Sequence, residues 1–112
     1  MPGKLTYFGL AARGECIRAL CFLANHEFED NKVTPEQFGA MKESLPLGSL
    51  PVWEEDGNTI CQSSAILRML GIRLGYYSKD PNTMWAIDSL IDFMEDNYGN
   101  MLGRAATVVF GG

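Results

Sequence analysis

The 112-residue sequence predicts an α/β protein with a mixed sheet, and two patterns support this prediction. The first is a strand–helix–strand unit over residues 5–33. The second is a pair of short strands around Asp56-Gly57, a dipeptide typical of tight hairpins, with a helix directly after them. A further short helix lies between the two patterns, so the predicted order is β-α-β-α-β-β-α. This order favours a mixed sheet with helices packed on it.

The first half of the chain gives a local signal for each element. Residues 5–8 are rich in strand-forming side chains, and residues 28–33 form a weaker strand pattern. Between them, residues 15–24 predict a helix, because apolar side chains recur on one face. These side chains are Ile17, Leu20, Cys21 and Ala24. Residues 34–37 (TPEQ) form a capping box with proline at the first helical position, which predicts the start of a short helix.

The hairpin and the helix after it are also defined by local signals. The two strands are expected at residues 50–53 and 59–61. The helix that follows is expected to begin at a serine and to end at a glycine. The candidates are Ser63 or Ser64 for the cap, and Gly71 or Gly75 for the end. Its apolar face is expected to carry Ala65, Ile66, Met69 and Leu70.

The sequence divides into a first domain, residues 1–75, a linker, residues 76–82, and a helical segment, residues 83–112. Thr83 is predicted to cap a long helix with one apolar and one acidic face. Residues 103–112 show no convincing helical period. A lone amphipathic helix cannot bury its own apolar face, so we expect this segment to need a partner.

Composition and charge limit the classes of function. A hydrophobic content of 46% with 21% charged residues is that of a globular protein. The net charge of −5 argues against nucleic acid as a partner. Three cysteines without a CxxC spacing and a single histidine argue against a metal site and favour reduced thiols. The sequence shows neither an apolar signal region nor a membrane-spanning segment, so a cytoplasmic protein is expected.

Two neighbouring motifs predict a ligand site. Pro51 stands at the mouth of a strand, where its missing N–H lies outside the ladder. If the Leu50–Pro51 bond is cis, the backbone of Leu50 would face outward and could pair with an extended peptide. Gln62 and Ser63 precede a helix whose first N–H groups favour a carboxylate. Together the two motifs predict a small acidic peptide as the ligand.

These motifs belong to a wider resemblance. The matching stretches are KLTYFGLAARGECIRALC, FGAMKESLPLGSLPVWEEDG and ICQSSAILRMLG, followed by the GYYSKDP linker and a helix. Over residues 4–98 the chain resembles the thioredoxin-like N-terminal domain of the cytosolic glutathione transferases, of the tyrosine type and closest to the sigma class. The resemblance implies a thioredoxin-like sheet, glutathione as co-substrate and no metal.

The resemblance implies roles for two residues near the thiol of glutathione. Tyr7 aligns with the catalytic tyrosine, whose hydroxyl donates a hydrogen bond to the glutathione sulfur and favours the thiolate, the nucleophilic form. Arg13 aligns with an arginine near the thiol and glycyl end, where it shapes the electrostatics. The alternatives are a half-buried strand tyrosine and a solvated loop charge. Ala11 departs from the family, because an arginine is common there.

The remaining implied roles concern the two carboxylates and the backbone of glutathione. Lys42 matches a lysine that pairs with the glycyl carboxylate, although an ordinary exposed charge is the alternative. Phe38 replaces a tryptophan and has no N–H to donate to that carboxylate. The resemblance also implies that the backbone of Leu50 binds the cysteinyl unit and that Pro51 is the cis proline. Gln62 and Ser63 are implied to bind the γ-glutamyl carboxylate. Asp96 is implied to reach the γ-glutamyl amine across a dimer interface. For Ser63 a simple helix cap, and for Asp96 a solvated acidic face, are the alternatives.

Two functions follow as expectations. The first is an enzyme that activates the thiol of glutathione for attack on an electrophile, or that uses glutathione for an isomerisation. The second is a non-catalytic, transferase-like structural or interaction subunit of a larger assembly. The departures at Ala11, Phe38 and Ser49, the last of which stands where a glutamine is frequent in the family, favour this alternative. Only the first helix of the family's second, all-helical domain is present. The chain is therefore expected to be a fragment, to form a homodimer, or to have its last helix covered by a partner chain.

Overall fold

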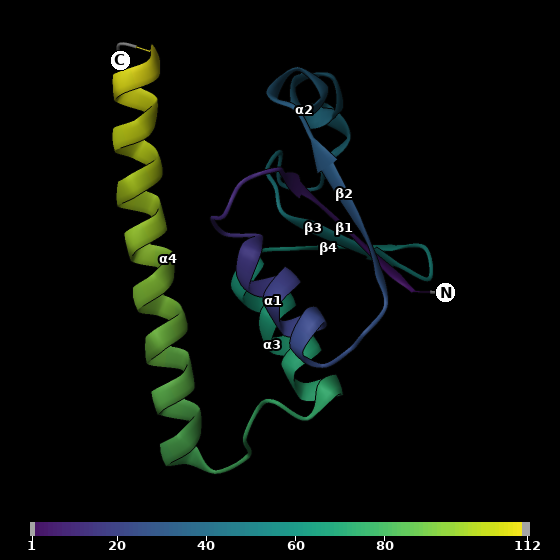
Figure 1. The fold of residues 1–112 in the computed structure, drawn as a ribbon, viewed down its shortest axis with the longest axis vertical. Helices are drawn as coiled ribbons and strands as arrows, with labels where there is room; N and C mark the ends of the chain where they lie inside the picture. The colour runs from purple at the N-terminus through teal and green to yellow at the C-terminus, as the bar shows by residue number, and fades with distance from the viewer. Residues whose placement is uncertain (1, 111–112) are drawn as a thin grey trace. The chain divides into compact units, whose positions relative to one another are not determined.

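A computed structural model describes the backbone of residues 2–110 and the side chains of residues 2–99 (Figure 1). The chain divides into two compact units, Met1–Tyr76 and Tyr77–Gly112. The first contains the sheet with its helices, and the second contains one long helix.

The first unit is built on a four-stranded mixed sheet. Its strands are β1 (Gly3–Phe8), β2 (Phe28–Val33), β3 (Val52–Glu55) and β4 (Asn58–Cys61), in the spatial order β2-β1-β3-β4. β1 and β2 are parallel, whereas β3 is antiparallel to both β1 and β4. This is the predicted thioredoxin-like arrangement. Asp56 and Gly57 form the predicted hairpin turn, with φ of 48° and 79°, the left-handed backbone that a two-residue turn requires.

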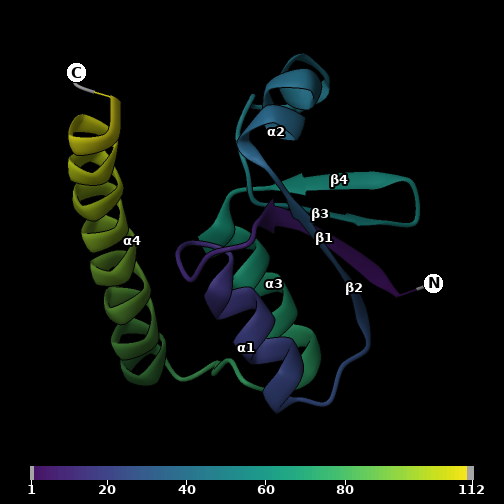
Figure 2. The same cartoon turned by 45° about the horizontal axis from the view of Figure 1, so that its top comes forward.

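Helices cover both sides of this sheet. α1 (Glu15–Leu23) and α3 (Ser63–Leu74) pack against each other on one side. α2 (Pro35–Met41) and the short 3-10 helix η1 (Lys42–Ser44) lie on the other side, as Figure 2 shows. The capping box of α2 is confirmed: the Gln37 N–H donates to the Thr34 hydroxyl (3.1 Å) and the Thr34 N–H donates to the Gln37 side chain (2.8 Å).

The core lies between the sheet and the α1–α3 pair. Its fully buried members are Leu5, Ile17, Cys21, Trp53, Ile66 and Leu70. The apolar face predicted for α1 is therefore confirmed at Ile17 and Cys21. On α3 the face is narrower than predicted, because Ala65 is exposed. Burying each of the large aliphatic side chains stabilises the fold by about 1.5–3 kcal/mol.

The start of α3 differs from the prediction. Neither Ser63 nor Ser64 is the cap, because Gln62 occupies the N-cap position and Ser63 is the first helical residue. The side chain of Gln62 makes no capping hydrogen bond. The end of α3 agrees with one of the two candidates, since Gly75 follows the helix with a left-handed φ of 82°.

The second unit is α4 (Pro81–Phe110). It begins inside the predicted linker, and the predicted cap at Thr83 is wrong. Asp80 caps the helix instead, because its carboxylate accepts from the Thr83 N–H and hydroxyl, both at 3.0 Å, and Pro81 suits the first helical position. The helix also includes residues 103–110, where no period was found; a hydrophobic period reports which face packs, not whether the backbone is helical. Residues 111–112 of that stretch lie outside the described residues.

None of the helices in the described part of the chain is both long enough and apolar enough to cross a membrane.

Candidate functional site

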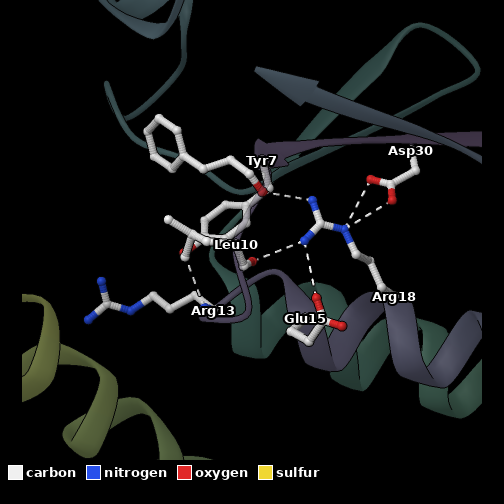
Figure 3. A network of polar contacts seen from close by, with 7 residues as sticks. Tyr7, Leu10, Arg13, Glu15, Arg18 and Asp30 are labelled. Carbon is white, nitrogen blue, oxygen red and sulfur yellow. Dashed lines mark hydrogen bonds and ion pairs between the residues drawn. The ribbon is translucent and has the colours of Figure 1, made fainter. Parts of the chain in front are cut away.

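Tyr7 lies near the carboxyl end of β1 and is only 3% exposed. The backbone N–H of Arg13 donates a hydrogen bond to its hydroxyl oxygen over 3.2 Å (Figure 3). This bond uses a lone pair of the phenol oxygen and not its proton. The loop between β1 and α1 therefore folds back over the strand and holds the Tyr7 hydroxyl from one side.

Gly14 allows this close approach of loop and tyrosine. A Cβ atom at this position would lie 2.4 Å from Cδ2 and 2.6 Å from Cγ of the Tyr7 ring. The φ of Gly14 is −79°, so the glycine is required here by space and not by backbone conformation.

Arg18 of α1 holds the same loop at its start. Its Nη2 donates to the Phe8 carbonyl (2.9 Å). Its Nη1 donates to the Leu10 carbonyl (3.2 Å), as Figure 3 shows. No pattern in the sequence indicates a role for Arg18, because its acceptors include main-chain carbonyls that any residue carries. A charged residue in the middle of a surface helix otherwise indicates only a solvated face.

The guanidinium of Arg18 also joins two carboxylates. Its Nε donates to Asp30 on β2 (3.0 Å), and its Nη1 donates to Glu15 one turn earlier on α1 (3.2 Å). The Arg18 side chain is only 11% exposed, and its guanidinium carbon lies 5.7 Å from the centre of the Tyr7 ring. A positive charge is thus fixed beside the ring of the tyrosine.

A row of aromatic rings leads from Tyr7 to Lys42. Tyr7 contacts Phe8 edge-on at 5.5 Å between ring centres, and Phe8 contacts Phe38 of α2 in the same way at 5.4 Å. The ammonium of Lys42 lies 5.8 Å from the centre of the Phe38 ring. The two predicted binding residues of α2 and η1 are therefore in contact with each other and are linked to Tyr7.

The segment before β3 lies at the same end of the sheet. The Leu50–Pro51 peptide bond is cis, as the resemblance implied. Pro51 is buried, and β3 begins one residue later, at Val52. Val52 pairs with Thr6, so Leu50 and Pro51 lie at the end of β1 that carries Tyr7.

Gln62 and Ser63 reach this end from β4. Val52 pairs with Cys61 on its other side, and Gln62 follows directly. Gln62 is exposed and has a positive φ of 73° with ψ at 113°, a conformation that costs a residue with a side chain about 1–3 kcal/mol. Ser63 is 7% exposed and opens the first turn of α3. A helix N-terminus with a strained residue before it thus faces the Tyr7 end of the sheet.

The structure therefore brings eight of the nine predicted site residues to one end of the sheet or to elements in contact with it. These are Tyr7, Arg13, Phe38, Lys42, Leu50, Pro51, Gln62 and Ser63. The ninth, Asp96, is exposed on α4 in the second unit, and its role across a dimer interface stays a prediction. The roles of the other eight toward a ligand also stay predictions.

The cysteines lie outside this chemistry. All three are free thiols. Cys21 is buried in the core, and burial raises its pKa from 9.0 to about 11, so it stays protonated and unreactive at neutral pH. Within residues 2–99, no three His, Cys, Asp or Glu side chains gather in a way that could hold a metal ion.

The fold and this site place the chain in the thioredoxin-like class, and known proteins define its family. Residues 3–71 match the family model described as "Glutathione S-transferase, N-terminal domain". Glutathione S-transferase 2 of Caenorhabditis elegans is 43% identical over 93 residues, which are 83% of this chain and 50% of that protein.

Two solved structures give the same result. A glutathione S-transferase from Ascaris lumbricoides is 33% identical, with a TM-score of 0.84 over 100% of this chain and 55% of that one. The prostaglandin synthase D of Nilaparvata lugens is 40% identical, with a TM-score of 0.77 over 86% of this chain and 48% of that one.

The chain belongs to the glutathione S-transferase family. The predicted resemblance to the cytosolic transferases is thereby confirmed. The chain spans about half the length of the relatives that it matches.

Proposed function

We propose that this chain binds glutathione at the Tyr7 end of the sheet and activates its thiol for attack on an electrophile. The observation that carries the proposal is the meeting of three features at that end. They are the Tyr7 hydroxyl held by the Arg13 N–H, the Leu50–Pro51 segment, and the N-terminus of α3 at Ser63. Family membership supports the choice of glutathione among small acidic peptides.

Tyr7 would stabilise the thiolate of glutathione. Because the Arg13 N–H occupies a lone pair of the Tyr7 oxygen, it draws electron density from that oxygen and strengthens the Tyr7 O–H as a donor. A hydrogen bond from this O–H to sulfur favours the charged thiolate over the thiol. The thiol proton leaves to solvent, the sulfur forms a bond to the electrophilic carbon, and the leaving group departs with the electron pair of its own bond.

The two carboxylates of glutathione find different partners. Ser63 and the first N–H groups of α3 suit the γ-glutamyl carboxylate, because a helix N-terminus carries partial positive charge. The strained backbone of Gln62 supports a binding role, since such strain persists where function requires it. Leu50 would pair its backbone with the cysteinyl unit, and Pro51 would set the direction of that backbone.

Lys42 would pair with the glycyl carboxylate. Its ammonium is fixed near the Phe38 ring, although its side chain is exposed. Phe38 has no N–H to add a second bond to that carboxylate, and one hydrogen bond to a charged group is worth about 1.5–3 kcal/mol. We therefore expect glutathione to bind more weakly here than it would beside a tryptophan.

A second candidate is a transferase-like subunit without catalysis. Phe38 and Ala11 depart from the family pattern. In this alternative residues 1–75 are kept as a scaffold, and residues 83–112 contact a second copy or a partner chain. The first candidate, by contrast, requires a second substrate, which is a small electrophile or, as the name of the Nilaparvata lugens relative suggests, the substrate of an isomerisation. It also places Asp96 near the γ-glutamyl amine of glutathione bound to a dimer partner. Its location would be cytoplasmic.

Titration calorimetry of the full chain with glutathione tests the proposal. We expect saturable binding, weakened roughly 10- to 150-fold by Ser63→Ala, because one hydrogen bond to a charged carboxylate is lost. Ser89→Ala is the matched control, since Ser89 is an exposed helical serine of the second unit that donates only to the Ala86 carbonyl. A folded chain that binds no glutathione would eliminate the enzyme and leave the scaffold.

A further inference from the structure

One side chain, Arg18, holds the start of the loop at residues 9–14, and the other end of this loop reaches Tyr7. Its guanidinium fixes the start of the loop through the carbonyls of Phe8 and Leu10. At the other end of the same loop, the N–H of Arg13 donates to the Tyr7 hydroxyl. The planar fork of an arginine suits this task, because it offers several N–H groups in fixed directions. The loop is therefore set by Arg18 before it reaches Tyr7.

The other contacts of Arg18 fix the guanidinium itself. Asp30 on β2 and Glu15 on α1 accept from it, so the group is tied to a strand and to its own helix. An exposed ion pair contributes little to stability, but at 11% exposure this side chain is well shielded from solvent. Two carboxylates on two different elements leave the fork little freedom to rotate away from the loop.

Arg18 also acts on Tyr7 directly. Its guanidinium carbon lies 5.7 Å from the centre of the Tyr7 ring. When the Tyr7 O–H donates to a thiolate, negative charge grows on the phenol oxygen. The guanidinium lies against the ring, so its positive charge favours that change, and the carboxylates of Asp30 and Glu15 offset part of the effect.

We propose that Arg18 is a positioning residue for Tyr7: it holds the loop that presents the Arg13 N–H to the Tyr7 hydroxyl, and it supplies positive charge beside the ring. The inference rests on the proposed function, because the Tyr7 hydroxyl is the group proposed to bind the thiol. Arg18 itself donates to protein groups and not to the reacting atoms.

Three variants separate positioning from general stability. Arg18→Met removes the fork and the charge but keeps an unbranched apolar side chain. Arg18→Lys keeps the charge without the fork. Arg73→Met is the matched control, because Arg73 is also a helical arginine that donates to a carboxylate, that of Glu55 at 2.6 and 2.8 Å, and Arg73 belongs to the far end of the sheet.

The first measurement needs no glutathione. Amide hydrogen exchange at Arg13, followed by NMR, reports the bond between its N–H and Tyr7. We expect exchange to become about fivefold faster in Arg18→Met and in Arg18→Lys, because a bond worth about 1 kcal/mol is loosened. We expect no change in Arg73→Met. Unchanged protection of Arg13 in both folded Arg18 variants would overturn the inference. If Arg18→Met does not fold, Arg18→Lys decides.

The second measurement follows the thiol. The ultraviolet absorbance of the thiolate of bound glutathione, recorded against pH, gives the pKa of that thiol. We expect this pKa to rise by about one unit in Arg18→Met, which is a roughly tenfold smaller acid dissociation constant for the thiol, with kcat reduced and the KM for glutathione nearly unchanged. A purely structural arginine would lower thermal stability and leave the pKa where it was, which would contradict the inference.

The two measurements also separate this inference from the proposed function. If the unmodified chain binds no glutathione, the proposed function fails, while the exchange of the Arg13 amide still decides whether Arg18 sets the loop. If the Arg18 variants bind glutathione and the pKa of its thiol equals that in the unmodified chain, the proposed function stands and the inference fails.

Discussion

The two ends of the sheet in the first unit use the same kinds of residue for different purposes. At the hairpin end, Glu55 accepts from the indole N–H of Trp53 (3.0 Å) and from Arg73 (2.6 Å). There Arg73 of α3 donates to a carboxylate side chain of β3. At the Tyr7 end, Arg18 meets main-chain carbonyls of a loop as well as carboxylates.

The two ends of the sheet also differ in why their residues adopt a positive φ. At the hairpin end, the left-handed residues Asp56 and Gly57 occupy a turn that requires such a backbone. At the Tyr7 end, Gln62 is left-handed with no turn to explain it and no capping bond from its side chain. We interpret the hairpin end as arranged for stability, and the strain at the Tyr7 end as the cost of holding backbone and hydroxyl groups in place.

The largest expected effect is the loss of turnover in Tyr7→Phe. The change removes one hydroxyl, and the hydrogen bond to a charged sulfur is worth about 1.5–3 kcal/mol, so kcat/KM should fall roughly 10- to 150-fold. Thermal unfolding should show a modest loss of about 1 kcal/mol, because the Arg13 N–H loses its acceptor while the ring keeps its place beside Phe8. Steady-state assays with glutathione and a chromogenic electrophile, together with a melting curve, check both. An unchanged rate would favour the scaffold.

The next effect concerns Cys21, which lies in the core and serves neither end. Its pKa is about 11 in the folded chain against 9.0 as the ordinary value, so the folded state holds the thiol proton more tightly. The stabilisation is complete below pH 9 and is lost as pH rises toward 11. The difference of about two units corresponds to roughly 2–3 kcal/mol.

Urea unfolding at several pH values checks this expectation. The unfolding free energy of the unmodified chain should fall more steeply between pH 9 and 11 than that of Cys21→Ala. Parallel slopes would show that Cys21 does not ionise differently on unfolding. Thiol reagents at neutral pH should modify Cys21 only after unfolding.

A change at the hairpin end should act on stability alone. Glu55→Ala removes the acceptor of the buried Trp53 indole and the partner of Arg73. An unpaired buried donor costs about 1–3 kcal/mol, and the half-exposed Arg73 adds little to this. The urea midpoint should fall while the affinity for glutathione stays constant. A matching loss of affinity would show that the two ends are coupled and would break the comparison.

The same contrast explains how far the sequence could predict the molecule. The strands, the capping box of α2 and the turn at Asp56-Gly57 follow from local signals, so they were found with small errors at their ends. Most site positions came from the family resemblance, because no local rule identifies Tyr7 or Lys42 as functional. The role of Arg18 was not predicted, because its partners include main-chain carbonyls and an aspartate twelve residues away.

The errors at helix starts have a physical reason as well. Ser63 is a good capping residue by type, yet the chain uses it as the first residue of α3 and places Gln62 before it with a positive φ. Propensity rules describe the conformation of lowest local energy, and this site departs from that conformation. Asp80 was overlooked for the opposite reason, since both Asp80 and Thr83 fit the cap and only the geometry chooses between them.

The smallest expected effect on stability, and a sharp test of the comparison, is Gln62→Gly. Glycine adopts a φ of 73° without steric cost, so the change relieves about 1–3 kcal/mol of strain. It also increases the freedom of the unfolded chain and loses about 0.5–1 kcal/mol in return. The chain should therefore be as stable as before, or up to about 2.5 kcal/mol more stable, while its affinity for glutathione falls because the amide side chain is gone. Urea unfolding and calorimetry on the same samples check both halves.

As a control, Gln37→Gly removes a glutamine from the capping box of α2 and should lower stability instead. If Gln62→Gly destabilises the chain as much as that control does, Gln62 holds no stored strain and the Tyr7 end is ordinary structure. If stability rises and affinity falls, the strain is retained for binding, and the difference between the two ends of the sheet is a difference between function and folding.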